Sequence, residues 1–257
     1  MPDPADAAFE VLEPHWPAGP GVEALCSTRA GGVSQAPWNS LNLGDHVGDD
    51  LASVAANRAS YTRRLGVRPV FLKQVHGTEC VPLRADTPDG TTADACYTRE
   101  RGVACTIMVA DCLPLLFADT RGGLVAAAHA GWRGLLGQSG HGVLESVMQV
   151  LDPAHTVAWL GPCIGPQAFE VGPEVLQAYA QHDADCAAYF SPSSPGKWLA
   201  DLPGLARQRL RGLGLPDSCI HGNDASATWC TVTQVSRFFS HRRDRVSGRL
   251  AASVWLA

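Results

Sequence analysis

The sequence predicts a single α+β domain with a large hydrophobic core. Its expected strands and helices follow one another without the steady βα alternation that produces a parallel sheet. The 257 residues contain no internal repeat, no low-complexity linker and no change of composition that would divide the chain. Hydrophobic residues make up 46% and charged residues 18%, which is ordinary for a globular protein. We therefore expect residues 1–257 to form one domain, with residues 1–20, rich in proline and alanine, as a loosely attached N-terminal segment.

The expected strands are short apolar runs bounded by turn-forming residues. They cover residues 22–27, 70–75, 93–97, 103–109, 113–118, 124–128, 157–160 and 251–256. The fifth and sixth runs are joined by the turn sequence DTRGG and therefore predict an antiparallel hairpin. If Ala118 pairs with Leu124 in this hairpin, Leu113 lies opposite His129.

Four helices are expected from capping residues and from the spacing of apolar side chains. They cover residues 51–65, residues 142–151, a segment that Pro173 opens, and residues 201–213. Asp50 or Ser53 is the candidate cap of the first helix, and proline suits the first turn of the third because its missing N–H would be unbonded there. The glycine-dense stretch at residues 131–142 is expected to be a plain turn from strand to helix, since it matches no phosphate-binding fingerprint.

Charge and composition argue against several classes of function. The net charge is −5 and the isoelectric point is near 6.0, so the charge balance favours neither nucleic acid nor an acidic membrane as a partner. No apolar run is long enough to cross a bilayer, and the first eight residues lack the basic stretch of a signal peptide. Nine cysteines, irregularly spaced and without a C-x-x-C pair, favour free thiols in a reducing compartment. We expect a cytoplasmic protein that binds no nucleic acid or membrane and has no obligate protein partner.

Cys112 and His129 are the candidate centre of an active site because each follows a buried apolar run. Cys112 ends the tripeptide ADC after residues 103–109, and His129 closes the run at residues 124–128. Across the expected hairpin their side chains would be roughly 5–8 Å apart, near enough to share a metal ion or a proton. Rigid strand ends of this kind hold reactive groups in place.

With His76 as a third partner, metal binding becomes the favoured interpretation of Cys112 and His129. It follows the apolar run at residues 70–75, so all three side chains come from strand ends. Two histidines and one cysteine suit catalytic zinc, which keeps a fourth position for water and lowers the pKa of that water to ~7. The alternative is a cysteine nucleophile with His129 as its base, where Asp111 orients the histidine or carries a proton.

Four arginines are candidates to bind an anionic group of the substrate, since a guanidinium matches phosphate and carboxylate. Arg29 and Arg133 lie in loops flanked by glycine, where a ligand can approach closely. Arg242 and Arg243 are equally compatible with exposed salt bridges.

Eight motifs, spread from about residue 22 to the C-terminal region, carry a resemblance to a known family. They are STRAGGVS (27–34), SLNLG (40–44), KQVHG (73–77), ADCLP (110–114), HAGWRG (129–134), GPCIGP (161–166), FEVG (169–172) and FFSHRRD (238–244). Together, and in this order, they resemble the bacterial YfiH family. Its members have been named laccase-domain or polyphenol oxidase proteins and, later, purine nucleoside phosphorylases.

The resemblance implies a four-layer α/β/β/α sandwich with mixed sheets. It also implies a metal, zinc with copper as the alternative, held by His76, Cys112 and His129. The implied reactions are phosphorolysis of adenosine, inosine and methylthioadenosine, and deamination of adenosine, so purine nucleosides and phosphate are the expected small-molecule partners. The expected substrate- and phosphate-binding residues in the matched motifs are Arg29, Asn42, Gln74 and Arg133.

The leading hypothesis is therefore a zinc-dependent purine nucleoside enzyme, and three rivals stay open. A cysteine hydrolase that edits peptidoglycan precursors would use Cys112 and His129 as a dyad. A copper-dependent polyphenol oxidase would bind its metal at the same residues, although the chain lacks the clustered His-x-His pairs that hold several coppers. A protein without catalytic activity would carry a closed, structural zinc site.

Overall fold

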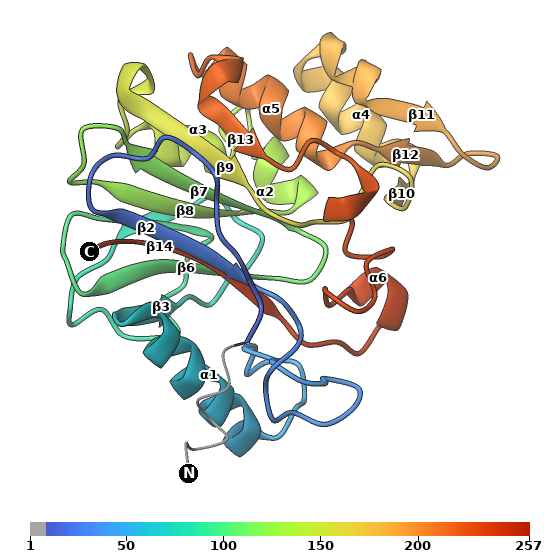
Figure 1. The fold of residues 1–257 in the computed structure, drawn as a ribbon. Coiled ribbons are helices and arrows are strands. Elements are labelled where there is room, and N and C mark those ends of the chain that lie inside the picture. Colours follow the sequence, from blue (N-terminus) through green and yellow to red (C-terminus); the bar gives the residue numbers. More distant parts are fainter. Residues whose placement is uncertain (1–8) are drawn as a thin grey trace.

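Two β-sheets lie face to face at the centre of the molecule, and helices cover their outer faces (Figure 1). The computed structural model describes residues 9–257. Helix α1 (Leu51–Leu65) packs on the first sheet, while α2 (Trp132–Leu136), α3 (Val143–Met148) and α5 (Leu202–Gly212) pack on the second. This order of helix, sheet, sheet and helices confirms the expected four-layer sandwich with mixed sheets.

The first sheet has its most buried strands near its centre. In spatial order it contains β1 (Val11–Leu12), β2 (Val22–Ser27), β14 (Leu250–Leu256), β6 (Val103–Val109) and β3 (Arg68–Phe71). β3 runs parallel to β6, and the other neighbours are antiparallel. Every residue of β6 and β14 is buried, because both faces of the sheet are covered and neither strand needs a polar face.

The second sheet holds the hairpin on which the candidate site is built. In spatial order it contains β13 (Ile220–Gly222), β9 (Thr156–Leu160), β7 (Leu113–Asp119), β8 (Val125–Ala130), β5 (Ala95–Thr98) and β4 (Cys80–Pro82). β13 is parallel to β9 and β4 to β5, while the remaining pairs are antiparallel. Ala126 and Ala128 of β8 face the helix layer, and their small side chains let α3 lie close to the sheet.

The core between the two sheets is built from alternate positions of strands on both sides. Ile107 and Val254 come from the first sheet, and Leu116 and Trp159 come from the second, each at most 2% exposed. The neighbouring positions face the opposite way, so that Phe117 packs against the helix layer. Both sheets are therefore fixed on both faces, and the ends of their strands are rigid supports.

Smaller elements close one side of the molecule. Strands β10 (Glu170–Val171), β12 (Trp198–Ala200) and β11 (Phe190–Pro192) form a three-stranded sheet next to α4 (Pro173–His182), and α6 (His241–Asp244) lies on the same side (Figure 1). Short 3₁₀ helices cover Pro153–His155, Ala184–Tyr189, Asp217–Cys219 and Ala227–Trp229. Within residues 9–257, no helix has the length and apolar character to cross a bilayer.

The hairpin of β7 and β8 differs from the expected register. Ala118 pairs with Val125 rather than with Leu124, so the predicted register is wrong by one residue. The turn is displaced by one residue, from 119–123 to 120–124, because Asp119 continues β7 and its N–H donates to the carbonyl of Leu124 at 3.0 Å. This shift displaces every cross-strand pair of the hairpin by one position.

The start of the described chain is packed on the fold. Phe9 is 7% exposed and stacks on Tyr61 of α1, with ring centroids 6.2 Å apart. β1 pairs with the end of β2, so the expectation of a loosely attached segment is wrong for residues 9–12. Residues 1–8 of the expected segment lie outside the described residues.

Two segments near the candidate site also differ from expectation. The strand expected at residues 70–75 ends at Phe71, and residues 72–79 cross from β3 in the first sheet to β4 in the second. The glycine-dense stretch is more than a turn, because it contains the short helix α2 directly after β8. The helix expected to follow it is shorter than predicted and ends at Met148.

Candidate active site and metal centre

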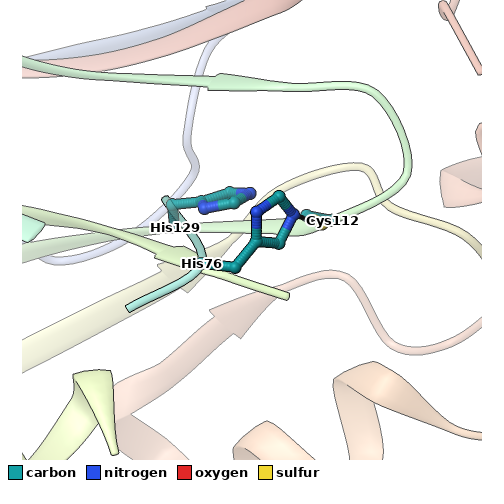
Figure 2. A group of neighbouring side chains, drawn as sticks. All are labelled: His76, Cys112 and His129. Carbon is teal, nitrogen blue, oxygen red and sulfur yellow. Dashed lines mark hydrogen bonds between the residues drawn. The ribbon is translucent and has the colours of Figure 1, made fainter. Parts of the chain in front are cut away.

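His76, Cys112 and His129 converge from three different segments (Figure 2). His76 lies in the crossover between the two sheets, Cys112 directly precedes β7, and His129 lies within β8. Their ligand atoms are all within 4.8 Å of one another, and Cys112 Sγ is 3.7 Å from His76 Nε2. The three side chains that the sequence singled out are therefore neighbours, and we refer to them as the donor cluster.

The backbone beside the donor cluster takes left-handed conformations that non-glycine residues rarely adopt. His76 has a φ of 59° and Asp111 a φ of 89°. The carboxylate of Asp94 holds the turn at His76, because it accepts the N–H groups of Val75, His76 and Gly77 at 3.0, 2.9 and 2.7 Å. This turn directs the imidazole of His76 toward the cluster.

Asp94 also orients His129, and sequence reasoning missed it. Its carboxylate is wholly buried and lies 2.8 Å from His129 Nδ1. Because Asp94 occupies Nδ1, the Nε2 atom of His129 is left for the cluster, an arrangement common behind histidines that bind metals. The available signal was a single acidic residue inside the run ADAC at residues 93–96, since a buried carboxylate needs hydrogen-bonding partners.

Charge interactions favour the ionised thiol of Cys112. Burial alone would raise the pKa of this thiol, but His129 and His76 together lower it to about 6. Burial alone would lower the pKa of His129, yet Cys112 and Asp94 raise it to about 9. The pKa of Asp94 lies below its ordinary value because its hydrogen bonds and the charge of His129 outweigh its burial. The thiolate, which binds metals and acts as a nucleophile, is therefore favoured at neutral pH.

The donor cluster fits a metal ion. Two imidazole nitrogens and a thiolate match the preferences of zinc and copper. Within residues 9–257, this is the one group of three or more His, Cys, Asp or Glu side chains close enough to share an ion. Gly131 keeps the space open, because a Cβ atom at this position would lie 2.9 Å from His76 Cδ2 and 3.0 Å from Cys112 Sγ.

The carboxylate of Asp111 binds two residues of the C-terminal part of the chain, Thr231 and Arg242. It accepts hydrogen bonds from Thr231 Oγ1 and from the backbone N–H of Arg242, both at 2.6 Å. The expectation that Asp111 orients the histidine is therefore wrong, because the side chain bonded to His129 is Asp94. Asp111 does line the candidate site, where it fastens the segment that carries Arg242.

A cavity of about 490 Å³ opens at the donor cluster, within the size range of small-molecule sites. Its walls come from parts of the chain that are far apart in sequence. The lining residues that sequence analysis did not assign to a site include His46, Met108, Ile164, Phe169, Leu202, His241, Arg245 and Arg249. No local pattern marks them, because tertiary packing alone brings them together.

Arg29 is engaged with the protein and does not line the cavity. Its guanidinium donates to the carbonyls of Asn39 and Val235 at 3.1 and 2.9 Å and lies 4.9 Å from the ring centroid of Phe239. Arg243 is engaged in the same way, since it donates to several backbone carbonyls of the C-terminal segment. Neither arginine is placed to meet a ligand at the donor cluster.

Asn42 also lies outside the cavity lining and is wholly buried. Its Oδ1 accepts the N–H groups of Gly44 and Arg249, each at 2.9 Å, and its Nδ2 donates to Asp49 at 2.8 Å. Asn42 therefore holds a cavity residue, Arg249, in place instead of facing a ligand itself.

Gln74 and Arg133 do line the cavity. The amide of Gln74 donates to the carbonyl of Met108 and accepts its N–H, both at 2.8 Å, which ties the crossover to β6. Arg133 is exposed, and its guanidinium lies 4.2 Å from the ring centroid of Trp132. Of the four expected substrate-binding residues, Arg133 is thus the one whose polar atoms are available to a ligand at the cavity.

Relatives of the chain match it over nearly its whole length. Residues 23–257 match the model of a family described as multi-copper polyphenol oxidoreductase laccase. Purine nucleoside phosphorylase PA4543 of Pseudomonas aeruginosa is 48% identical over 248 residues, which are 95% of this chain and 98% of that protein. Purine nucleoside phosphorylase YfiH of Escherichia coli is 45% identical over 251 residues, which are 96% and 99%.

Solved structures share the fold. Protein NMB0706 of Neisseria meningitidis superposes with a TM-score of 0.89 at 41% identity, over 96% of this chain and 98% of that one. YlmD from Geobacillus stearothermophilus superposes with a TM-score of 0.81 at 31% identity, over 92% of each chain. Together with the family model, these likenesses span both sheets and the donor cluster. The chain belongs to the laccase-domain family that includes YfiH.

Proposed function

We propose that the protein is a purine nucleoside phosphorylase whose active site is the cavity at the donor cluster. The observation that carries the proposal is the convergence of three metal-binding side chains within a cavity of nucleoside size. Relatives named purine nucleoside phosphorylase, at 45% and 48% identity over nearly the whole chain, support the same activity.

Phosphorolysis makes three demands on such a site. An oxygen of hydrogen phosphate forms a bond to C1′ of the ribose while the bond from C1′ to the purine nitrogen breaks. The bonding electron pair leaves with the purine, which takes up the proton that hydrogen phosphate gives up, so the products are the free base and ribose 1-phosphate. The site must therefore hold a flat base, place an anion beside C1′ and keep competing water away.

Apolar side chains of the cavity supply a wall for the base. Ile164, Phe169 and Leu202 are at most 8% exposed, and Trp132 adds a partly exposed ring. Purine rings stack well on such surfaces. The wall carries one indole N–H and no other polar side-chain group, so it favours no single pattern of purine substituents. This composition supports adenosine, inosine and methylthioadenosine as substrates.

A zinc ion would be held by His76, Cys112 and His129. When bound, zinc would supply a Lewis acid for the hydrolytic deamination of adenosine, in which water provides the new oxygen of inosine and ammonia leaves. The chain contributes the positions of the donors, because Asp94 fixes both the backbone at His76 and the ring of His129. The same three donors also suit copper.

Products formed from adenosine and phosphate by zinc-loaded protein test the proposal. Adenine and ribose 1-phosphate report phosphorolysis, and inosine reports deamination. Cys112→Ser should lower both activities at least about tenfold, because it removes a metal donor. Cys219→Ser is the matched control, since it removes a half-buried thiol outside the cavity. Absence of all three products at high protein concentration contradicts the proposal.

A cysteine hydrolase acting on peptidoglycan precursors is the second candidate. Cys112, His129 and Asp94 stand in series as a nucleophile, a base and an orienting acid, and the lowered pKa of the Cys112 thiol suits this role. Such an enzyme would keep its activity after chelation and lose it on alkylation of Cys112. Hydrolysis of a precursor peptide by chelated protein would therefore favour the hydrolase over the nucleoside enzyme.

A multi-copper oxidase receives less support from the site, although the description of the family names that activity. The described residues offer a single group of three donors, which makes one mononuclear site. Oxidation by several coppers needs further clusters of ligands. Copper is thus an alternative metal for the donor cluster rather than the basis of a separate proposed activity.

A further inference from the structure

The cavity is rich in arginine and histidine side chains although the whole chain has a net charge of −5. Four arginines and two histidines beyond the donor cluster line it, namely Arg133, Arg242, Arg245, Arg249, His46 and His241. Among the described residues of the lining, Asp111 is the one carboxylate, and it bonds a threonine hydroxyl and a backbone N–H. It forms no ion pair with any of these arginines.

Two of the four arginines are partly engaged with aromatic rings. Arg242 donates to a backbone carbonyl at 2.9 Å and lies 5.6 Å from the ring centroid of Phe169, and Arg133 lies over the ring of Trp132. The guanidinium of Arg245, by contrast, has no hydrogen-bond or ion-pair partner within residues 9–257. Arg245 is exposed, so this charge is available to a ligand.

The side chain of Arg249 is held in place by one of its nitrogens, and its other two nitrogens stay unpaired within residues 9–257. Its Nη1 donates to the carbonyls of Ser247 and Gly248 at 2.9 and 3.1 Å, while Nε and Nη2 have no partner in the described part of the chain. Its N–H donates to Asn42, and its stem packs so closely on Gly44 that a Cβ there would lie 2.7 Å from Arg249 Cγ. A glycine is therefore needed at that position to seat the arginine.

Arg249 lies near the donor cluster and near His46. Burial lowers the pKa of its guanidinium, and the charges of Cys112 and Asp111 raise it. This half-buried guanidinium forms no ion pair within residues 9–257, so an anion bound to it would gain charge-assisted hydrogen bonds. Arg245 is the C-cap of α6, and its φ of 64°, rare for a residue other than glycine, fixes where its side chain leaves the helix at the cavity.

We propose that Arg249 and Arg245, with His46, form the subsite for the phosphate co-substrate beside the donor cluster. The identity of the anion rests on the proposed phosphorylase function. Two guanidinium groups present paired donors that match the oxygens of a phosphate dianion, and an imidazole adds a third contact. The subsite would hold the attacking oxygen in position and offset the charge of the dianion.

Binding of orthophosphate to full-length, zinc-loaded protein, measured by calorimetry without nucleoside, tests the subsite. Arg249→Met and Arg245→Met should each raise the Kd for orthophosphate at least about tenfold, because each removes charged hydrogen bonds. Arg99→Met removes the same charge from an exposed position outside the cavity and should leave the Kd unchanged. An equal Kd in the wild type and in both cavity variants overturns the proposal.

Two further measurements control for folding and for the source of the phosphate group. Arg245 is exposed, so its replacement tests the subsite even if Arg249→Met fails to fold, and Arg249→Lys should recover part of the binding. Adenosine 5′-monophosphate is the second ligand. If its binding depends on Arg249 and that of orthophosphate does not, the subsite takes the phosphoryl group of a nucleotide and the co-substrate assignment is overturned.

Steady-state kinetics distinguish the phosphate subsite from the proposed phosphorylase activity. In Arg249→Met the KM for phosphate should rise at least about tenfold, while the KM for adenosine changes little. Phosphate binding that depends on Arg249, without any turnover in the wild type, contradicts the phosphorylase and supports the subsite. Turnover with an unchanged KM for phosphate in both cavity variants contradicts the subsite and supports the phosphorylase.

Discussion

Asp94 supports two of the three donors from one buried position. Its carboxylate accepts three backbone N–H groups around His76 and also bonds Nδ1 of His129. Hydrogen bonds to a charged acceptor in a site shielded from water are stronger than those between neutral groups. The geometry of the donor cluster therefore depends on a residue that contributes no ligand atom.

Asp94→Asn should lower the affinity for zinc about 10- to 100-fold. The amide has the size of the carboxylate, but its NH₂ group cannot accept a backbone N–H, so at least one hydrogen bond becomes a repulsion. Competition with a chromophoric chelator measures the affinity. Asp86→Asn, at an exposed position, is the matched control. Wild-type affinity in Asp94→Asn would show that this carboxylate does not set the geometry.

Gly131→Ala should weaken zinc binding although it removes no donor atom. The new Cβ would lie 2.9 Å from a ring carbon of His76 and 3.0 Å from the sulfur of Cys112, so one of them must move. Gly212→Ala makes the same change in open space in α5 and should raise the stability by about 0.4–1 kcal/mol without affecting zinc. Zinc titration of both variants checks this prediction, which fails if their affinities are equal.

At the scale of the elements, α1 shows how a helix is fixed by its N-cap, the residue just before its first turn. Asp50 accepts the N–H of Ser53 at 2.9 Å and its hydroxyl at 2.8 Å, which satisfies a backbone donor that has no partner inside the helix. The hydrogen bonds from Ser53 hold the pKa of the Asp50 carboxyl below its ordinary value. The cap is therefore strongest when this carboxyl is ionised.

Asp50→Ala should lower the thermal stability at neutral pH, and the difference from wild type should shrink in acid. Because the pKa of Asp50 is lowered by folding, its contribution is fully present above the ordinary aspartate pKa of ~3.9 and is lost as the pH falls through the folded pKa. Asp50→Ser caps without titrating and serves as the control. Thermal unfolding over this pH range measures the effect, and a difference that stays constant into acid contradicts it.

Local patterns predicted the elements where apolar runs are bounded by clear turns, as in β6 and α1. The register of the hairpin was not predictable, because Asp119 is equally suited to end a strand or to begin a turn. The role of Asp94 depends on His129, 35 residues away. The link between Asn42 and Arg249 spans 207 residues. Contacts at such separations leave no periodic signal. The sequence therefore predicted that the three side chains of the donor cluster lie together, but it did not predict the roles of Asp94 and Asn42.

At the scale of the whole molecule, the donor cluster joins the two sheets. His76 lies on the crossover from β3 to β4, Cys112 lies on the link from β6 of the first sheet to β7 of the second, and His129 lies within β8. Gln74 fastens the same crossover to β6 of the first sheet through the backbone of Met108. A metal ion bound here would brace both layers of the sandwich.

Removal of the metal should therefore lower the thermal stability of the entire fold. Zinc that binds the folded chain and not the unfolded chain raises the free energy of unfolding by about 2.7 kcal/mol when the free zinc concentration is about 100 times its Kd. Scanning calorimetry with chelator, and again after zinc is restored, measures the change. His129→Ala should unfold at a temperature independent of zinc. Insensitivity of the wild type to zinc would contradict a metal that joins the sheets.

The last strand in chain order, β14, lies between β2 and β6. A chain emerging from the ribosome therefore exposes the unpaired edges of both strands until residues 250–256 arrive, and such edges tend to pair with other chains. Arg249 directly precedes β14, so the anion subsite is completed in the same late step. A closed first sheet and a complete cavity thus arise together once residues 249–256 are available, and a chain cut before Arg249 would have neither.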